Sequence, residues 1–148
     1  MAKVLILYIS TTGNTEMMAH AIAGYLEYKN HEVEIKTFDF DPIDVEELLD
    51  YDLVLIGTHS SDDGQIPFEA EDFYDELDEV NLAGRLFGVF GSGDTAYDIY
   101  CESIELMADK LTFQGAKLVP ERLKVDLTPS NEDLERCDAF AEQALQLI

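Results

Sequence analysis

The chain contains no tryptophan and few cysteines, prolines and basic residues. Its two cysteines, Cys101 and Cys137, are too few and too far apart for a disulfide framework or for a CxxC redox or zinc motif. We therefore expect both to be buried free thiols in a reducing compartment. No apolar run approaches the length of a membrane-spanning helix, and the N-terminus enters a strand-like segment without a signal sequence. These absences exclude a disulfide scaffold and a membrane protein, and they predict a cytoplasmic location.

Basic residues are scarce beside acidic ones: 9 Lys and Arg stand against 32 Asp and Glu, for a formal net charge of -23. A chain this acidic repels nucleic acid and the anionic membrane surface, so neither is an expected partner. The charge would attract a basic protein surface, but it is equally well explained by solubility. The 148 residues, of which 47% are hydrophobic, suffice for one domain, residues 1–148, with a core of its own.

Short apolar runs alternate with longer amphipathic stretches along the chain. Three runs are apolar throughout, as parallel strands covered on both faces are: 4–9, 53–57 and 86–90. Segment 31–37 alternates like an edge strand, and a last strand over 117–125 is interrupted around Pro120. Helices are expected at about 15–29, 44–50, 67–77, 101–112 and 131–147, with Ser130 as the N-cap of the last. The alternation predicts an α/β fold, a three-layer, doubly wound parallel sheet with helices on both faces.

Doubly wound sheets bind ligands outside the carboxyl ends of their strands, where the strand order reverses. The first loop at that edge, 10–15, reads Ser-Thr-Thr-Gly-Asn-Thr and joins a buried strand to a helix. Hydroxyls of Ser10, Thr12 and Thr15 can converge there with backbone N–H groups at the helix N-terminus, where the helix dipole favours an anion. Gly13 lets the backbone wrap closely around a ligand. The loop predicts a phosphate site built of neutral donors; a helix merely capped by Ser or Thr would need one hydroxyl, and this loop offers several.

The third loop at that edge, 91–97, reads Gly-Ser-Gly-Asp-Thr-Ala-Tyr. Gly93 can present a backbone N–H group to a planar polar ring, and Tyr97 can stack on the face of that ring. By itself this pattern also fits a glycine-rich turn with a surface tyrosine. Together with the phosphate loop it indicates a ligand that carries both a phosphate and a ring.

Four segments together resemble the flavodoxin family: STTGNT, YDLVLIGT, IPFEAEDFYDEL and GVFGSGDTAYDIYC. The resemblance runs from Lys3 to the last helix, with these segments in the family's order and spacing, and the length of the chain resembles the short-chain class, which lacks an insertion in the last strand. It implies a five-stranded parallel sheet in flavodoxin order, one non-covalently bound FMN, and one-electron transfer between protein partners.

Carried over position by position, the resemblance assigns cofactor-binding residues to three loops. The phosphate would be held by Ser10, Thr11, Thr12, Gly13, Asn14 and Thr15. The inner face and edge of the isoalloxazine ring would be flanked by Thr58, His59, Ser60, Ser61 and Asp62. The pyrimidine edge and outer face would meet Ser92, Gly93, Asp94 and Tyr97, with Cys101 nearby.

The second loop at that edge, 58–65, departs from the family pattern over 59–64. Short-chain flavodoxins usually read something like Tyr-Thr-Trp-Gly-Asp-Gly here, whereas this chain reads His-Ser-Ser-Asp-Asp-Gly. Ser61 stands in place of the Trp and Asp62 in place of the first Gly. Loss of an aromatic stack should weaken FMN binding by roughly 1 kcal/mol and leave the ring wetter. His59 either covers the ring in part, titrates near it and couples reduction to pH, or is a solvent-facing loop imidazole.

The predicted function is one-electron carriage at low potential. Asp62, Asp63 and Asp94 lie on the flanking loops, and negative charge around a reduced, anionic flavin disfavours that state. The expected partners are basic-surfaced redox proteins, a reductase and electron-accepting enzymes, which would bind transiently to a monomer. Nothing in the loops provides a nucleophile or general base, so we expect no enzyme.

Three other functions remain open. A flavodoxin-like FMN protein could be dedicated to activating or regulating one partner enzyme. A degenerate relative could have lost tight flavin binding through its altered second loop. A receiver-type regulatory domain shares the topology, but it needs acidic residues at the end of the first strand, where this chain has Ser10 and Thr11.

Overall fold

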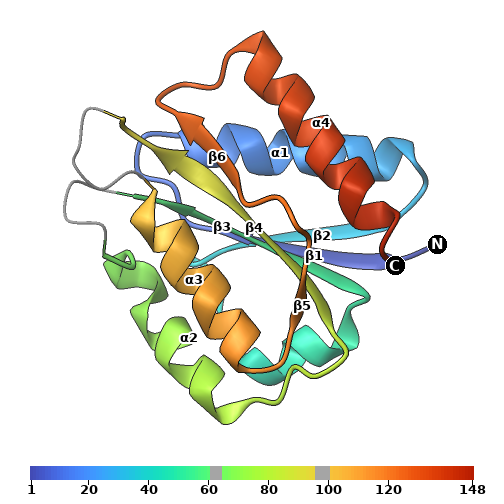
Figure 1. Ribbon diagram of the computed structural model, residues 1–148, viewed down its shortest axis with the longest axis vertical. Helices are drawn as coiled ribbons and strands as arrows, with labels where there is room; N and C mark the ends of the chain where they lie inside the picture. The colour runs from blue at the N-terminus through green and yellow to red at the C-terminus, as the bar shows by residue number, and fades with distance from the viewer. Residues whose placement is uncertain (61–64, 96–100) are drawn as a thin grey trace.

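Six strands form one parallel sheet in the computed structural model, which describes residues 1–60, 65–95 and 101–148 (Figure 1). In chain order they are β1 (Lys3–Tyr8), β2 (Glu32–Thr37), β3 (Leu53–His59), β4 (Leu86–Gly93), β5 (Lys117–Leu118) and β6 (Leu123–Asp126). Their order across the sheet is β2-β1-β3-β4-β5, and β6 also pairs with β4. The predicted doubly wound sheet with five strand positions is confirmed, with the fifth position shared by β5 and β6.

Helices cover both faces of the sheet (Figure 1). The α-helices are α1 (Asn14–Tyr28), α2 (Glu71–Glu76), α3 (Glu102–Phe113) and α4 (Asn131–Leu145), and the 3-10 helices are η1 (Val45–Asp50), η2 (Phe68–Ala70) and η3 (Leu77–Glu79). Side chains on one face, such as Ile6 and Leu55, pack against α1 and α4. Their neighbours Leu7 and Ile56 pack on the other face against α2 and α3. The inner strands are apolar throughout because successive side chains enter opposite layers.

The fifth strand position is split at Pro120, as the sequence predicts. β5 pairs with the beginning of β4 at Leu86 and Phe87, and β6 pairs with its end, from Phe90 to Gly93. Proline has no backbone N–H group to donate to a neighbouring strand, so the pairing is interrupted where Pro120 stands. The result places the end of β6 beside the end of β4.

Two of the expected helices differ in type. The segment expected to be one helix over 67–77 consists of η2, α2 and η3 in succession, and the one expected over 44–50 is the 3-10 helix η1. Backbone bonds that span three residues, such as Ala70 N–H to Pro67 O, tighten the ends of α2. Apolar spacing in so short a segment does not distinguish this tighter helix from an α-helix.

β3 and β4 extend further toward the ligand-binding edge than their apolar runs do. Thr58 and His59 still pair with Gly91 and Ser92. Gly91 is required there because a Cβ atom would lie 1.8 Å from the backbone oxygen of Thr58. His59, Ser92 and Gly93, expected in loops, are therefore the last residues of strands, and the sheet positions the side chains of His59 and Ser92.

α4 begins with the predicted N-cap. The Ser130 hydroxyl accepts from the backbone N–H of Asp133, and the Asp133 carboxylate accepts from the backbone N–H of Ser130. This reciprocal pair is a capping box. None of the helices in the described ranges combines the length and apolar character that crossing a bilayer demands.

Candidate functional site

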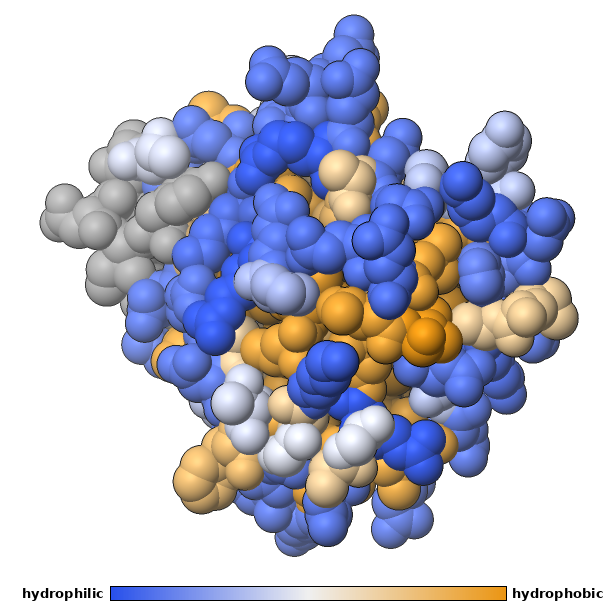
Figure 2. All heavy atoms as spheres, turned by 45° about the vertical axis from the view of Figure 1, so that its right-hand side comes forward, coloured by the Kyte–Doolittle hydropathy of each residue, from blue (hydrophilic) through white to orange (hydrophobic). Residues whose placement is uncertain are grey.

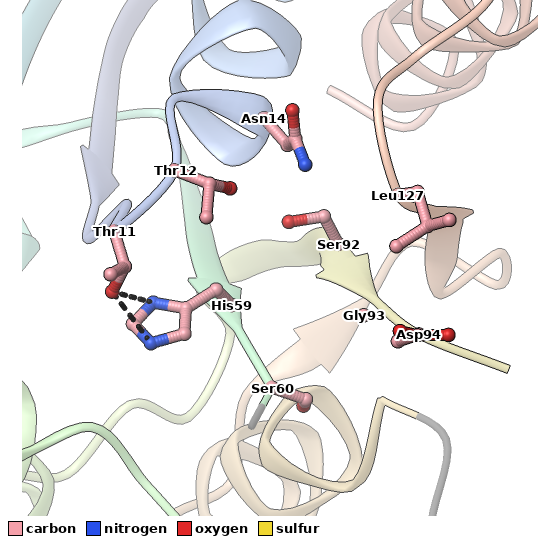
Figure 3. Close-up of a pocket in the computed structure, with 9 residues that line it drawn as sticks. All are labelled: Thr11, Thr12, Asn14, His59, Ser60, Ser92, Gly93, Asp94 and Leu127. Atoms are coloured by element: carbon pink, nitrogen blue, oxygen red, sulfur yellow. Dashed lines mark hydrogen bonds between the residues drawn. The ribbon is translucent and has the colours of Figure 1, made fainter. Parts of the chain in front are cut away.

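The carboxyl ends of β1, β3, β4 and β6 surround a cavity of about 310 Å³. Figure 3 shows its lining: Thr11, Thr12, Asn14, His59, Ser60, Ser92, Gly93, Asp94 and Leu127. The strand order reverses between β1 and β3, so the cavity lies at the switch point where such sheets bind ligands. Its volume is in the range of small-molecule sites.

The first loop forms a tight turn at the N-terminus of α1. The Ser10 hydroxyl accepts from the backbone N–H of Gly13 at 3.1 Å. Gly13, the N-cap residue, has a φ of 91°, a left-handed backbone conformation that residues with a side chain rarely adopt. It has no side chain with which to cap the helix, so the first N–H groups of α1 have no side-chain cap and could bind an anion. Thr12 and Asn14 add neutral donors to the cavity wall.

Thr15 has a different place from its predicted neighbours. Its hydroxyl is buried and lies 2.7 Å from the Ser92 hydroxyl at the end of β4. In this structure the pair fastens the first turn of α1 to the sheet behind the loop. Thr15 thus holds the beginning of α1 in place without lining the cavity itself. Its partner Ser92 does line the cavity.

His59 bridges two of the loops. Its Nε2 atom lies 2.9 Å from the Thr11 hydroxyl, and its ring is half-buried (Figure 3). The ring also lines a neighbouring cavity of about 350 Å³, together with Phe68 and Glu69. The imidazole is therefore partly buried and has a hydrogen-bond partner in the first loop.

A buried hydroxyl network anchors the second loop to α3. The Ser103 hydroxyl donates to the backbone oxygen of His59 at 2.9 Å, while its backbone N–H donates to the Ser60 hydroxyl at 3.0 Å. With that donation fixed, Ser103 Oγ accepts from the hydroxyls of Thr58 at 3.1 Å and Ser60 at 2.5 Å. Each of the three hydroxyls in the network has a hydrogen-bond partner.

Ser103 is a positioning residue that the sequence interpretation missed. It shares helical spacing with Met107 and Leu111, which are fully buried on the same face of α3. A serine on an otherwise apolar helical stripe was the available signal, because a buried hydroxyl needs partners.

The third loop is tied to the end of β6. The carboxylate of Asp126 accepts from both the backbone N–H and the hydroxyl of Thr95, at 3.0 and 2.9 Å. The backbone N–H of Leu127 donates to the oxygen of Gly93 at 2.8 Å. These bonds bring Leu127, which no sequence motif indicated, into the cavity wall beside Asp94.

Several predicted residues lie outside the described part of the chain: Ser61, Asp62, Asp63 and Tyr97. Five described ones do not line the cavity: Ser10, Gly13, Thr15, Thr58 and Cys101. Cys101 is fully buried and precedes α3, and it is not part of the cavity lining. Cys137 is buried as predicted, and burial raises the pKa of its thiol to about 12.

The described lining of the cavity includes no Lys or Arg. The cations at β6 are engaged elsewhere: the Lys124 amine lies 2.6 Å from the Glu105 carboxylate, which Arg122 also contacts. Burial alone would raise the pKa of Glu105, but the hydrogen bonds from Lys124 and Arg122 outweigh it, and the pKa lies below its ordinary value. An anion in the cavity would be held by neutral dipoles.

Flavodoxins are found by the family model, among the sequence relatives and among the solved structures that resemble this chain. The family model described as flavodoxin matches residues 6–140. The chain is 42% identical to probable flavodoxin 1 of Bacillus subtilis over 142 residues, which cover 95% of this chain and 89% of that protein. It is also similar to two crystal structures from Bacillus cereus. Oxidised flavodoxin 2 is 44% identical with a TM-score of 0.93, covering 99% of this chain and 100% of that one. Oxidised flavodoxin 1 is 36% identical with a TM-score of 0.94, covering 99% of each. Because both sequence and structure match over almost the whole length, the chain belongs to the flavodoxin family.

Proposed function

We propose that this chain carries single electrons between proteins through non-covalently bound FMN. The observation that carries the proposal is the cavity itself: in a chain of the flavodoxin family, it lies at the switch point of the sheet and opens on the N-terminus of α1. The close relatives are flavodoxins, so an electron carrier is favoured over a protein that activates one enzyme. We assign the chain no catalytic residue of its own.

The residues at the N-terminus of α1 fit a phosphate group. Thr11, Thr12 and Asn14 present hydroxyl and amide donors, and the backbone at Gly13 stays close and open because it carries no Cβ atom. The helix dipole adds a favourable field for negative charge within the first turn. These neutral groups would hold the phosphate without a neighbouring cation.

The remaining lining residues fit a planar ring with a polar edge. Ser60 and His59 flank one side, and Ser92, Gly93 and Asp94 flank another (Figure 3). Bound FMN would supply the redox chemistry, and the chain would orient it and limit its contact with water. The Ser103 network makes that orientation firm, since it fixes Thr58, Ser60 and the backbone of His59.

The charge around the cavity favours a low reduction potential. Asp94 lines the cavity, and Glu69 and Glu71 line its neighbour, while the described lining of both contains no Lys or Arg. Added negative charge on the cofactor would be repelled by these carboxylates at short range. The protein would therefore give up electrons readily to an acceptor.

We propose transient partners with basic surfaces, which the net charge of -23 would attract. The face shown in Figure 2 is mainly hydrophilic, with an apolar area near its centre. Phe68, 81% exposed beside the acidic residues of the second cavity, would give a partner an apolar contact. A monomeric, cytoplasmic carrier between a reductase and its acceptor enzymes is consistent with these features.

Electron delivery to a basic acceptor tests the function. The FMN-loaded, chemically reduced protein should reduce the basic protein cytochrome c, and the rate should fall steeply as salt screens the attraction. A Glu69→Gln, Glu71→Gln variant should show a lower rate and a weaker dependence on salt. Exposed carboxylates that line neither cavity, in a matched Glu132→Gln, Glu135→Gln variant, provide the control. A rate independent of salt in all three proteins would contradict the proposed docking.

A further inference from the structure

Leu127 is the single aliphatic side chain in the described lining of the cofactor cavity. It follows β6, and Figure 3 shows it across the cavity from Thr11 and His59. The residue is 52% exposed, although a leucine gains free energy when its surface is removed from water. An apolar group is thus held half in solvent at the wall of a polar site.

The backbone at Leu127 is also unusual. Among the described residues other than glycine, positive φ values occur at Asn30, Cys101 and Leu127. Asn30 follows α1, where asparagine commonly takes this conformation. Leu127 has a φ of 59°, which is unfavourable for a bulky side chain. Such conformations persist where the surrounding structure holds them, and they concentrate at ligand sites.

The contacts that hold the turn do not need a leucine. The turn is fastened by the bond from the Leu127 backbone N–H to Gly93 and by the Asp126 carboxylate on Thr95. Glycine or asparagine at position 127 would make the same backbone bond and adopt the same φ more easily. The local contacts therefore explain the conformation of the turn, but they do not explain why a leucine occupies position 127.

We infer that Leu127 is a cofactor-contacting residue, which forms the apolar wall of the cavity on the β6 side and is covered when FMN binds. The inference rests on the proposed function and adds a residue to the site. The free energy of covering the leucine would strengthen FMN binding and keep water from that side of the cofactor. The unfavourable backbone is then retained because it directs this side chain into the cavity wall.

Two measurements on Leu127→Asn test the inference: the melting temperature of the apoprotein, and the dissociation constant of FMN from quenching of its fluorescence. Asparagine suits the backbone and removes the apolar wall. The melting temperature should be unchanged or higher, whereas FMN should bind about fivefold more weakly or worse. Leu127→Met, which keeps an apolar side chain, should lose less affinity. Phe113→Asn removes an 85% exposed apolar residue at the end of α3 and should leave FMN binding unchanged.

Equal FMN affinity in wild type and Leu127→Asn would overturn the inference. A fall in the apoprotein melting temperature together with the loss of affinity would also overturn it, since Leu127 would then be a packing residue of the turn. If the wild-type protein itself binds no FMN, the proposed function fails, and the inference fails with it.

Discussion

At the scale of single residues, the site depends on hydroxyl groups and on one backbone conformation. Thr15 and Ser92 join α1 to β4, and Ser103 joins α3 to the end of β3, all of them buried. Each of these buried hydroxyls has a hydrogen-bond partner, so the loss of one leaves its partners unpaired away from water. The ligand-facing groups are thereby held in place by residues behind them.

Ser103→Ala should lower the free energy of unfolding by about 2 kcal/mol, because the hydroxyls of Thr58 and Ser60 and the oxygen of His59 lose their partner. Urea denaturation of the apoprotein measures the change. Thr112→Ala, at an exposed position of the same helix, should shift stability by less than about 0.5 kcal/mol. Equal effects of the two substitutions would show that the network contributes nothing.

Gly13→Ala and Gly24→Ala should change stability in opposite directions. Alanine at position 13 must adopt a φ of 91° and should cost about 1 kcal/mol or more, with weaker FMN binding because the turn around the phosphate shifts. Gly24 is exposed inside α1 with open space around it, so alanine there should stabilise by about 0.5–1 kcal/mol. Thermal unfolding of both variants is the measurement, and a stabilising Gly13→Ala would contradict the assigned turn.

Several of the loop residues predicted from the sequence line the cavity, whereas Ser103 and Leu127 were not predicted. The STTGNT loop can be recognised from the sequence because several hydrogen-bond donors directly follow an apolar strand. Ser103 and Leu127 belong to the site through contacts with residues more than 30 positions away. Such pairings depend on how β6 and α3 lie against β4 and β3, which no local pattern contains.

At the scale of elements, strand ends and helix caps determine where the site lies. Apolar runs correctly predicted β1, β3 and β4 but ended too early on the last two, since hydrogen bonding between neighbouring strands continues through polar residues such as Thr58 and Ser92. Pro120 correctly predicted the split of the last strand, because a missing N–H group is a property of the residue itself. The prediction of a single helix over 67–77 was wrong, because the segment consists of η2, α2 and η3. Its apolar spacing fits both helix types.

The capping box of α4 makes a testable element-scale contribution. The backbone N–H of Ser130, bonded to the carboxylate, holds the pKa of Asp133 below its ordinary value. The folded state thus binds a proton at Asp133 less readily than the unfolded state. The contribution is complete at neutral pH and is lost as the pH falls through the folded-state pKa.

Asp133→Asn should therefore lower the free energy of unfolding by about 1 kcal/mol at neutral pH, and by less in acid. Urea denaturation across the acid range measures both values. Asp138→Asn, an exposed position farther along α4, should show no such loss at neutral pH. A loss that grows as the pH falls would contradict the assignment.

At the scale of the whole molecule, charge is the dominant property. With 32 acidic and 9 basic residues, the folded chain repels itself, and this repulsion is relieved by salt. The apoprotein melting temperature should rise as monovalent salt is added from low concentration. Asn-for-Asp variants at the surface should show a smaller rise, and a melting temperature that falls with salt would contradict the role of self-repulsion.

The binding of FMN by the apoprotein tests the central claim most directly, with riboflavin as the comparison that lacks only the phosphate. Quenching of flavin fluorescence should saturate at sub-micromolar FMN, and riboflavin should bind about a hundredfold more weakly, because the dipoles at the N-terminus of α1 hold the phosphate. Equal affinity for FMN and riboflavin would show that the STTGNT loop holds no phosphate. FMN that stays free at tens of micromolar would show that the cavity does not bind the cofactor.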